Sequence, residues 1–274
     1  MSRPNTERRK GLGVIQQIFE ISLIGGLINL DDVPLTQMMI SQPIVAAPLI
    51  GWMFGDLQAG LVIGAFFELL MVYLLPIGCS VPLDGSLAAI IATGIYLLVG
   101  SSFGGQPEAL ISLAILSALP FSALAQKLSV LVREVNNRIS DRAQAAVLDK
   151  TPGKIDLLHF SGIGLFFLRS FSLCLISLLI AVPIIRSVIP FLSPGLVHGL
   201  KLLYFAYLMI GIALLFDAFR SRDTYWLFAL SFLLATLFST VWPLPAWMAF
   251  GMPCVLVGAG YALRERLRGK YGCR

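Results

Sequence analysis

The sequence contains few charged residues and few of the residue types that catalytic sites need. Asp, Glu, Lys and Arg make up 13% of its 274 residues, against about a quarter in a typical soluble protein. The two histidines, His159 and His198, are isolated, and no HExxH, P-loop, GxSxG or glycine-rich dinucleotide motif is present. We therefore predict no catalytic residue, no bound metal and no cofactor.

Cysteine is equally sparse. The four cysteines, at positions 79, 174, 254 and 273, stand singly, and no CxxC pair is present. This spacing excludes the usual redox and metal-binding cysteine motifs, and we interpret the cysteines as small buried apolar residues. The net charge of +5 comes without an aromatic-interleaved basic patch or a recognisable nucleic-acid module, so we predict no nucleic-acid partner.

Apolar residues, in contrast, are abundant. The hydrophobic fraction is 57% and the mean hydropathy is +0.86. Apolar runs of about 20 residues are long enough to cross a bilayer as helices. No small-residue cleavage site follows the first run, so no cleaved signal peptide is predicted. The sequence predicts an all-α, polytopic membrane helical bundle.

Three regions follow from the order of apolar and polar segments. Residues 1–125 form an N-terminal membrane region, residues 126–156 a cytoplasmic connector, and residues 157–274 a C-terminal set of membrane helices. The connector and both chain ends are basic, as expected of segments retained in the cytoplasm. The connector is predicted to be an amphipathic helix, either a solvated link or a docking platform for a soluble partner. Its apolar residues at helical spacing are Leu128, Leu131, Val135 and Ile139.

Residues 41–93 carry the functional signal. This apolar stretch contains three acids together with repeated glycines and prolines. Acids at bilayer depth usually face a bundle interior or a wet cavity, and helix breaks there are tolerated only beside protein or solvent. After the first apolar segment, the two acids and the proline of Asp31-Asp32-Val33-Pro34 can start a new helix. Pro43–Phe54 is too short to span and predicts a re-entrant or broken piece. Residues 57–75 predict a full crossing, and we expect about eight crossings plus re-entrant pieces.

Glu68 lies on the predicted helix 57–75, with Gly60 eight residues and Gly64 four residues before it. These positions share one helix face, and small residues at four-residue spacing let another backbone approach closely. The carboxylate should therefore face protein rather than lipid. Two roles are open: a structural acid bonded to a nearby helix end, or a ligand for a solute.

Asp56, Asp84 and Gln42 complete the candidate substrate-binding set. Each aspartate precedes an apolar helix, where aspartate commonly caps the first turn. A polar side chain at the tip of a broken helix is also where transporters hold hydroxylated or charged solutes. Gln42, directly before Pro43, offers both donor and acceptor atoms that suit a sugar hydroxyl.

Three segments follow one another in a specific order. They are residues 24–56 (IGGLINLDDVPLTQMMISQPIVAAPLIGWMFGD), 60–68 (GLVIGAFFE) and 76–84 (PIGCSVPLD). Taken together they resemble the IIC subunit of the mannose-type sugar permeases of the bacterial phosphotransferase system (PTS), a family that also covers fructose, sorbose and N-acetylated amino sugars. In that family a basic residue often precedes the proline matched by Pro43, and a proline often occupies the position of Leu83. Gln42 and Leu83 depart from this pattern, so the sugar is left open.

The resemblance implies a group-translocation permease subunit that is not an enzyme by itself. A IIC subunit pairs with a membrane IID subunit, holds the sugar within the bilayer and delivers it inward. Soluble IIA and IIB subunits relay phosphate from phosphoenolpyruvate to the sugar, and IIC itself carries no phosphorylated residue. The expected assembly is an oligomer of IIC–IID pairs in the bacterial inner membrane.

Other functions fit the same residues. The departures at Gln42 and Leu83 are compatible with a regulatory or scaffold homologue that has lost transport. Glu68 is compatible with the proton or sodium site of an ion-coupled transporter. A membrane-embedded hydrolase is disfavoured, because no nucleophile–base pair is recognisable.

Overall fold

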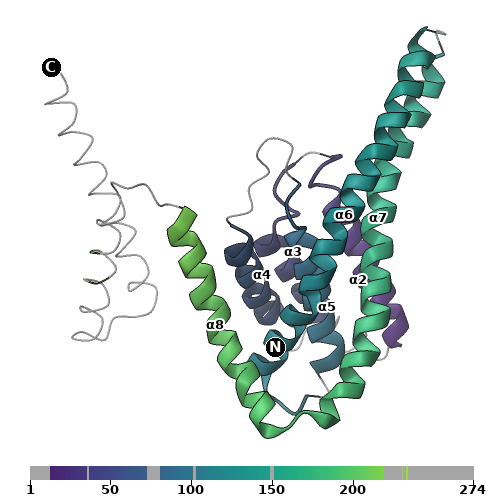
Figure 1. Cartoon of the computed structure of the whole chain (residues 1–274). Coiled ribbons are helices and arrows are strands. Elements are labelled where there is room, and N and C mark those ends of the chain that lie inside the picture. Colours follow the sequence, from purple (N-terminus) through teal and green to yellow (C-terminus); the bar gives the residue numbers. More distant parts are fainter. Residues whose placement is uncertain are drawn as a thin grey trace, which may run out of the picture. The chain divides into compact units, whose positions relative to one another are not determined.

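The computed structural model describes residues 13–35, 37–72, 81–100, 103–148 and 151–218, together with Leu230 and Leu233. All regular secondary structure within these residues is helical. The chain divides into two compact units, Met1–Leu214 and Leu215–Arg274, and the first holds the helices described below, apart from the end of α8. In chain order these are α2 (Val14–Asn29), α3 (Pro43–Phe54), α4 (Leu57–Met71), α5 (Gly85–Val99), α6 (Pro107–Leu148), α7 (Pro152–Val188), the short 3₁₀ helix η2 (Ile189–Phe191) and α8 (Pro194–Ala218) (Figure 1).

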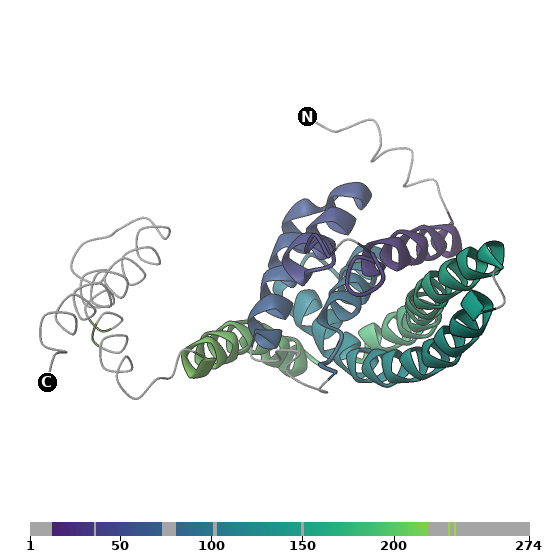
Figure 2. The ribbon, with the colours of Figure 1, turned by 90° about the horizontal axis from the view of Figure 1, so that it is seen from above.

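Helix α5 forms the centre of the first unit. It packs against α2, α3, α4, α6 and α7, and all of its residues except Tyr96 and Leu97 are buried. Seen from above, the α3–α4 pair lies on one side of α5, and α2 and α7 lie on the other (Figure 2). A helix that is apolar on every face is stable only when it is covered on every face, and the composition of α5 meets that condition.

Helices α3 and α4 form a closely packed antiparallel pair. Pro43 opens α3, and Gly55, with a φ of 102°, closes it; proline at the first position and a left-handed glycine after the last are favourable helix ends. A Cβ placed on Gly60 would lie 2.6 Å from the carbonyl oxygen of Ala47, so the two backbones are in contact. The prediction of a short, separate piece at Pro43–Phe54 is confirmed.

Three of the described helices are long and apolar enough to cross a membrane: Pro107–Leu148, Gly153–Phe191 and Pro194–Leu214. The predicted full crossing at residues 57–75 is not confirmed. Helix α4 has 15 residues and is about 22 Å long, which is shorter than the roughly 30 Å hydrocarbon core, and residues 73–80 lie outside the described part. The predicted total of about eight crossings is likewise not confirmed, because the last two apolar runs, 225–241 and 246–263, fall almost entirely outside the described residues.

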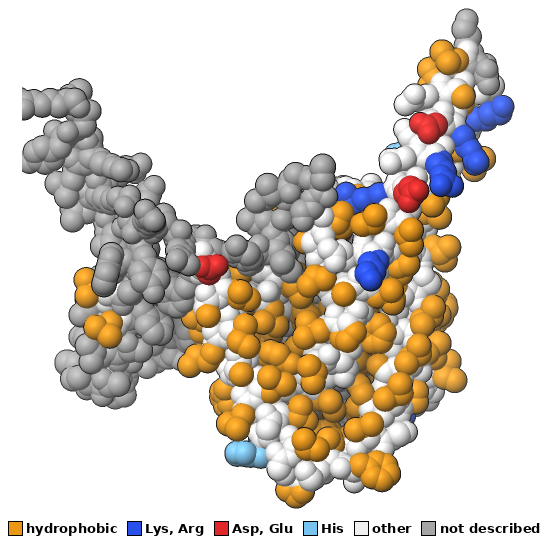
Figure 3. Space-filling view, in the orientation of Figure 1, with side chains coloured by type: hydrophobic (Ala, Val, Ile, Leu, Met, Phe, Trp, Pro, Cys, Tyr) orange, Lys and Arg blue, Asp and Glu red, His pale blue; other side chains and the backbone are white. Residues whose placement is uncertain are grey.

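Helices α6 and α7 form a long hairpin that projects beyond the other helices of the unit (Figure 1). The 42 residues of α6 extend about 63 Å, roughly twice the thickness of the hydrocarbon core. Charged side chains gather on the projecting part, whereas the rest of the unit presents a mostly hydrophobic surface in the same view (Figure 3). The amphipathic helix predicted within residues 126–156 is confirmed as helical up to Leu148, as the continuation of α6 rather than a separate element.

The segment between α2 and α3 differs from its prediction. Residues 30–34 form a turn and do not start a new helix. The reason is the buried Asp31 carboxylate, which accepts hydrogen bonds from the backbone N–H groups of Met38 (2.8 Å) and Ile40 (2.8 Å). These hydrogen bonds hold residues 38–40 against Asp31, so the chain turns between the end of α2 and the start of α3.

Candidate functional site

A polar cavity of about 410 Å³ lies where the breaks between helices meet. Its walls come from the loop after α2, the start of α3, the end of α4, the segment that leads into α5, and one face of α6. The cavity brings together three of the four predicted binding residues. The lining residues that matter below are Gln42, Glu68, Asp84, Ser86, Ser129 and Arg133.

Glu68 braces the start of α3. Its Oε2 atom accepts a hydrogen bond of 3.3 Å from the backbone N–H of Ile44, one of the first-turn N–H groups that have no partner inside their own helix. Gly64 allows this approach, since a Cβ there would lie 2.5 Å from the carbonyl oxygen of Pro43. The carboxylate faces protein, as predicted, and serves as a structural acid at a helix end. Glu68 also lines the cavity, and within the described residues its Oε1 atom accepts no hydrogen bond.

Asp84 ties three helices together. As the N-cap of α5, its Oδ1 atom accepts a hydrogen bond of 2.9 Å from the N–H of Leu87. Arg169 of α7 forms an ion pair with Oδ2, and the two side chains are only 3% (Arg169) and 8% (Asp84) exposed. Asn29, at the end of α2, donates to Oδ1 at 3.5 Å and accepts a 2.6 Å hydrogen bond from Ser170. The cavity wall at Asp84 is therefore fixed from behind by α2 and α7.

Gln42 and Ser86 bring hydrogen-bonding groups that have no partner within the described part of the chain. The side chain of Gln42 is exposed at the N-cap of α3 and makes no capping hydrogen bond. The Oγ atom of Ser86, in the first turn of α5, is buried without a partner among the described residues. A buried hydroxyl without a partner is unfavourable.

Asp56 lies outside this cavity. It is the N-cap of α4, where Oδ1 accepts a 2.9 Å hydrogen bond from the N–H of Ala59. Its Oδ2 atom accepts a 3.3 Å hydrogen bond from the hydroxyl of Tyr96. Asp56 and Glu68 stand near opposite ends of α4, about 18 Å apart along the helix axis. The structure thus groups Gln42, Glu68 and Asp84 and separates Asp56 from them.

The electrostatics of the cavity follow from two helix N-termini that open into it, those of α3 and α5. Each terminus carries a partial positive charge of about half an electron charge. Each also faces an acid: Glu68 of α4 lies at the start of α3, and Asp84 lies at the start of α5. The remaining acceptor oxygens, amide and hydroxyls suit a neutral molecule with several hydroxyl groups. No histidine or cysteine lies among the described lining residues.

Comparison with known proteins identifies the family of the chain. Residues 15–257 match the family model described as "PTS system sorbose-specific iic component". The chain belongs to this IIC family. The match begins in α2 and runs beyond α8, so it includes every element that forms the cavity.

Curated IIC relatives match most of the chain. The sorbose-specific EIIC component of Klebsiella pneumoniae is 27% identical over 198 residues, which are 72% of this chain and 70% of the relative. The mannose-specific EIIC component of Escherichia coli K12 is 23% identical over 222 residues, 80% of this chain and 78% of the relative. The fructose permease IIC component of Bacillus subtilis is 23% identical over 219 residues, with the same shares. The names differ in their sugar, so membership of the IIC family does not select one.

Two solved structures share the fold of this IIC chain. One, described as the structure of a membrane protein, has a TM-score of 0.70 at 22% identity and covers 95% of this chain and 98% of its own. The other is the cryo-EM structure of the mannose transporter ManYZ in complex with microcin E492, with a TM-score of 0.51 at the same identity and coverage. At this identity the likeness concerns the fold.

Sequence reasoning missed several residues that line the IIC cavity and one that supports it from behind. The supporting residue, Arg169, could have been found, because it is a lone cation within the apolar run 157–185, and charges at membrane depth usually pair with one another. Pairing this cation with the intramembrane acids would have suggested Asp84 as a candidate partner of Arg169. Ser86 and Ser129 stand in apolar or mixed segments without a motif, and only the folded chain shows that they line the cavity.

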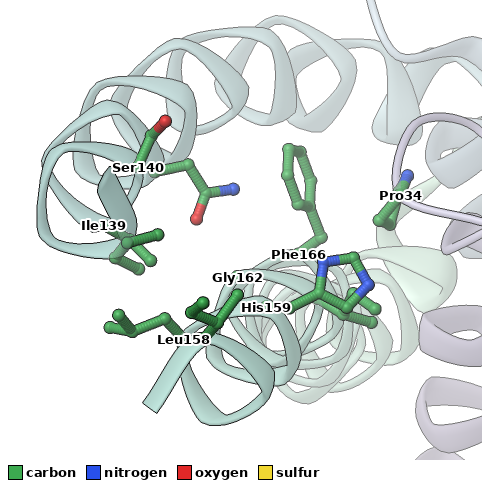
Figure 4. Close-up of a pocket in the computed structure, with 11 residues that line it drawn as sticks. Pro34, Ile139, Ser140, Leu158, His159, Gly162 and Phe166 are labelled. Carbon is green, nitrogen blue, oxygen red and sulfur yellow. The ribbon is translucent and has the colours of Figure 1, made fainter. Parts of the chain in front are cut away.

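A second cavity, of about 380 Å³, lies between α6 and α7 in the hairpin of this IIC chain (Figure 4). Ile139 and Ser140 of α6 face Leu158 and His159 of α7 across it, and Pro34 approaches from the loop after α2. The lining is mostly apolar, and it shares no residue with the first cavity. Nowhere in the described part of the chain do three His, Cys, Asp or Glu side chains gather as a metal site would require.

Proposed function

We propose that the chain is a IIC permease subunit that binds a sugar in the cavity lined by Gln42, Glu68 and Asp84 and carries it across the bacterial inner membrane. The observation that supports this most is the convergence of these three residues on one polar cavity at the ends of broken helices, in a chain of the IIC family. Transporters commonly bind their substrates where helices are discontinuous. The cavity volume also falls in the range of small-molecule sites.

Transport is proposed to be coupled to phosphorylation of the sugar by partner subunits. The partners implied by the family resemblance are a membrane IID subunit, with which IIC forms oligomers of IIC–IID pairs, and soluble IIA and IIB subunits that carry the phosphate. The names of the relatives make mannose, fructose and sorbose the first substrates to test. On this proposal the chain supplies binding and passage, and its partners supply the phosphoryl group.

Sugar binding should fall when a cavity acid is neutralised. The experiment uses the purified complex of this chain with its membrane partner and titrates mannose, fructose and sorbose. Glu68→Gln should weaken binding of the sugar that the wild type takes by about ten- to hundredfold, because loss of a charge-assisted hydrogen bond costs about 1.5–3 kcal/mol. Glu134→Gln is the matched control, since Glu134 is exposed on α6 and does not line the cavity.

A second variant separates binding from folding. The Gln42 side chain is exposed and makes no capping hydrogen bond, so Gln42→Ala should fold normally and weaken sugar binding by about two- to tenfold. Thermal unfolding is followed in parallel. Normal sugar binding by both variants would place the site elsewhere.

Sugar phosphorylation by this chain with the soluble subunits, but without any membrane partner, would contradict the proposed need for IID.

The projecting end of the α6–α7 hairpin should lie in the cytoplasm, because basic segments beside membrane helices are retained there. In a chain whose native cysteines are replaced by alanine, an impermeant maleimide added to intact cells should leave Asn137→Cys unlabelled. The same reagent should label Gly195→Cys, which lies beyond the opposite end of α7. Both positions are exposed. The reverse labelling pattern would invert the proposed topology.

A further inference from the structure

We propose that Arg133 is an anion-binding residue at the mouth of the sugar cavity and that it holds the phosphoryl group of the phosphorylated sugar. The inference rests on the proposed function and assigns to the same cavity a second ligand, a sugar phosphate. Three observations support it: the position of Arg133 on α6, the lack of an ion-pair partner for Arg133 among the described residues, and the acidity of the deeper wall.

Arg133 lies where α6 leaves the packed part of the unit. Ser129, one turn earlier, is the last buried residue of α6 before Ala146, and Arg133 is exposed. Both residues line the cavity, and four-residue spacing places them on one helix face. Helix α6 thus presents a hydroxyl inside the cavity and a guanidinium at its rim, on the side from which the hairpin projects.

Arg133 is the one cation among the described residues that line the cavity. Elsewhere Arg138 pairs with Glu134 at 3.6 Å and Arg169 pairs with Asp84. Arg133 forms no ion pair or hydrogen bond with any described residue. Asp32 lines the same cavity and attracts Arg133 electrostatically, with no hydrogen bond or ion pair between the two side chains.

The deeper wall sets the orientation of a sugar phosphate. Glu68 lies there without an ion-pair partner among the described residues, and its negative charge repels a phosphate dianion while accepting hydrogen bonds from neutral hydroxyls, whereas Arg169 already compensates the charge of Asp84. The planar guanidinium of arginine matches the geometry of phosphate oxygens and binds them in a bidentate manner. A sugar phosphate therefore satisfies the cavity in one direction only, with its ring inward and its phosphoryl group at Arg133.

The test compares the affinity of the purified complex for a sugar with its affinity for the monophosphate ester of that sugar. The sugar is the one of mannose, fructose and sorbose that the wild type binds. Arg133→Gln should weaken binding of the ester by about ten- to hundredfold and change binding of the free sugar by less than about twofold. Arg133→Lys, which keeps the charge without the planar fork, should retain part of the ester affinity. Arg138→Gln, on the same helix and outside the cavity, should change neither.

Unchanged ester binding in Arg133→Gln, or equal losses for the ester and the free sugar, would overturn the inference. A wild-type complex that binds the sugar but not its ester would also overturn it and would leave the proposed function intact. A wild-type complex that binds none of the sugars would instead remove the proposed function itself. Because Arg133 is exposed and unpaired within the described residues, its variants are expected to fold.

Discussion

Arg169→Met should lower the free energy of unfolding by about 3–5 kcal/mol. Arg169 and Asp84 are both buried, at 3% and 8% side-chain exposure, and removing one partner leaves the other charge uncompensated in a medium of low polarity. Methionine keeps most of the apolar volume of the arginine stem, so the loss reports on the charge rather than on packing. The measurement is thermal unfolding of the purified chain in detergent, followed by circular dichroism.

Two companion variants make this test specific. Arg142→Met is the control, because Arg142 is exposed on α6 and exposed charges contribute little to stability. Adding Asp84→Asn to Arg169→Met removes the orphaned charge and keeps a cap for α5, since asparagine caps helices about as well as aspartate. The double variant should recover most of the lost stability. If it stays as unstable as Arg169→Met, the buried charge is not the cause.

The same ion pair gives α7 an influence on a cavity that it does not line. Asp84 faces the cavity with one side and receives Arg169 on the other. Ser170 and Asn29 extend the connection to α2. A movement of α7 relative to α5 must therefore carry Asp84 along or break a buried ion pair, which costs several kcal/mol. If the chain transports sugar as proposed, the cavity wall at Asp84 and the hairpin helix α7 are expected to move together.

The parts of the fold that sequence reasoning predicted are those with local causes. The bounds of α3 follow from Pro43 and Gly55, whose backbone preferences act within one or two residues. The close approach at Gly60 and Gly64 follows from their spacing along one helix face. Caps at Asp56 and Asp84 were predictable for the same reason. Each of these signals needs only its neighbours in the chain.

The parts that were missed depend on residues far apart in the sequence. Arg169 and Asp84 are separated by 85 positions, and no local sequence pattern predicts that their side chains are in contact. The prediction of a helix start at Asp31-Asp32-Val33-Pro34 is wrong because it uses only the local pattern of two acids and a proline, whereas the Asp31 carboxylate binds N–H groups seven and nine residues later. The cavity itself is a product of packing, and Ser129 and Arg133 enter it only because α6 crosses the start of α5.

Gly64→Leu should cost about 3 kcal/mol or more in stability, at the upper end of what overpacking costs. A Cβ at this position would lie 2.5 Å from the carbonyl oxygen of Pro43 and 3.2 Å from the Cδ atom of Pro48. These atoms belong to the backbone and to a rigid ring, so they cannot rotate away as a flexible side chain would. The start of α3 must move off α4 to admit any side chain here.

Gly164→Leu is the matched control, and it should raise the stability that Gly64→Leu lowers. A Cβ at Gly164 of α7 meets no atom within 4 Å, and replacing a helical glycine by leucine favours the helix by up to about 1 kcal/mol. Thermal unfolding should therefore separate the two variants in direction as well as size. Sugar binding should separate them too, because displacing α3 from α4 takes the N–H of Ile44 away from Glu68 and moves Gln42 with it. Equal stability and equal sugar binding in the two variants would mean that the contact between α3 and α4 does not shape the cavity.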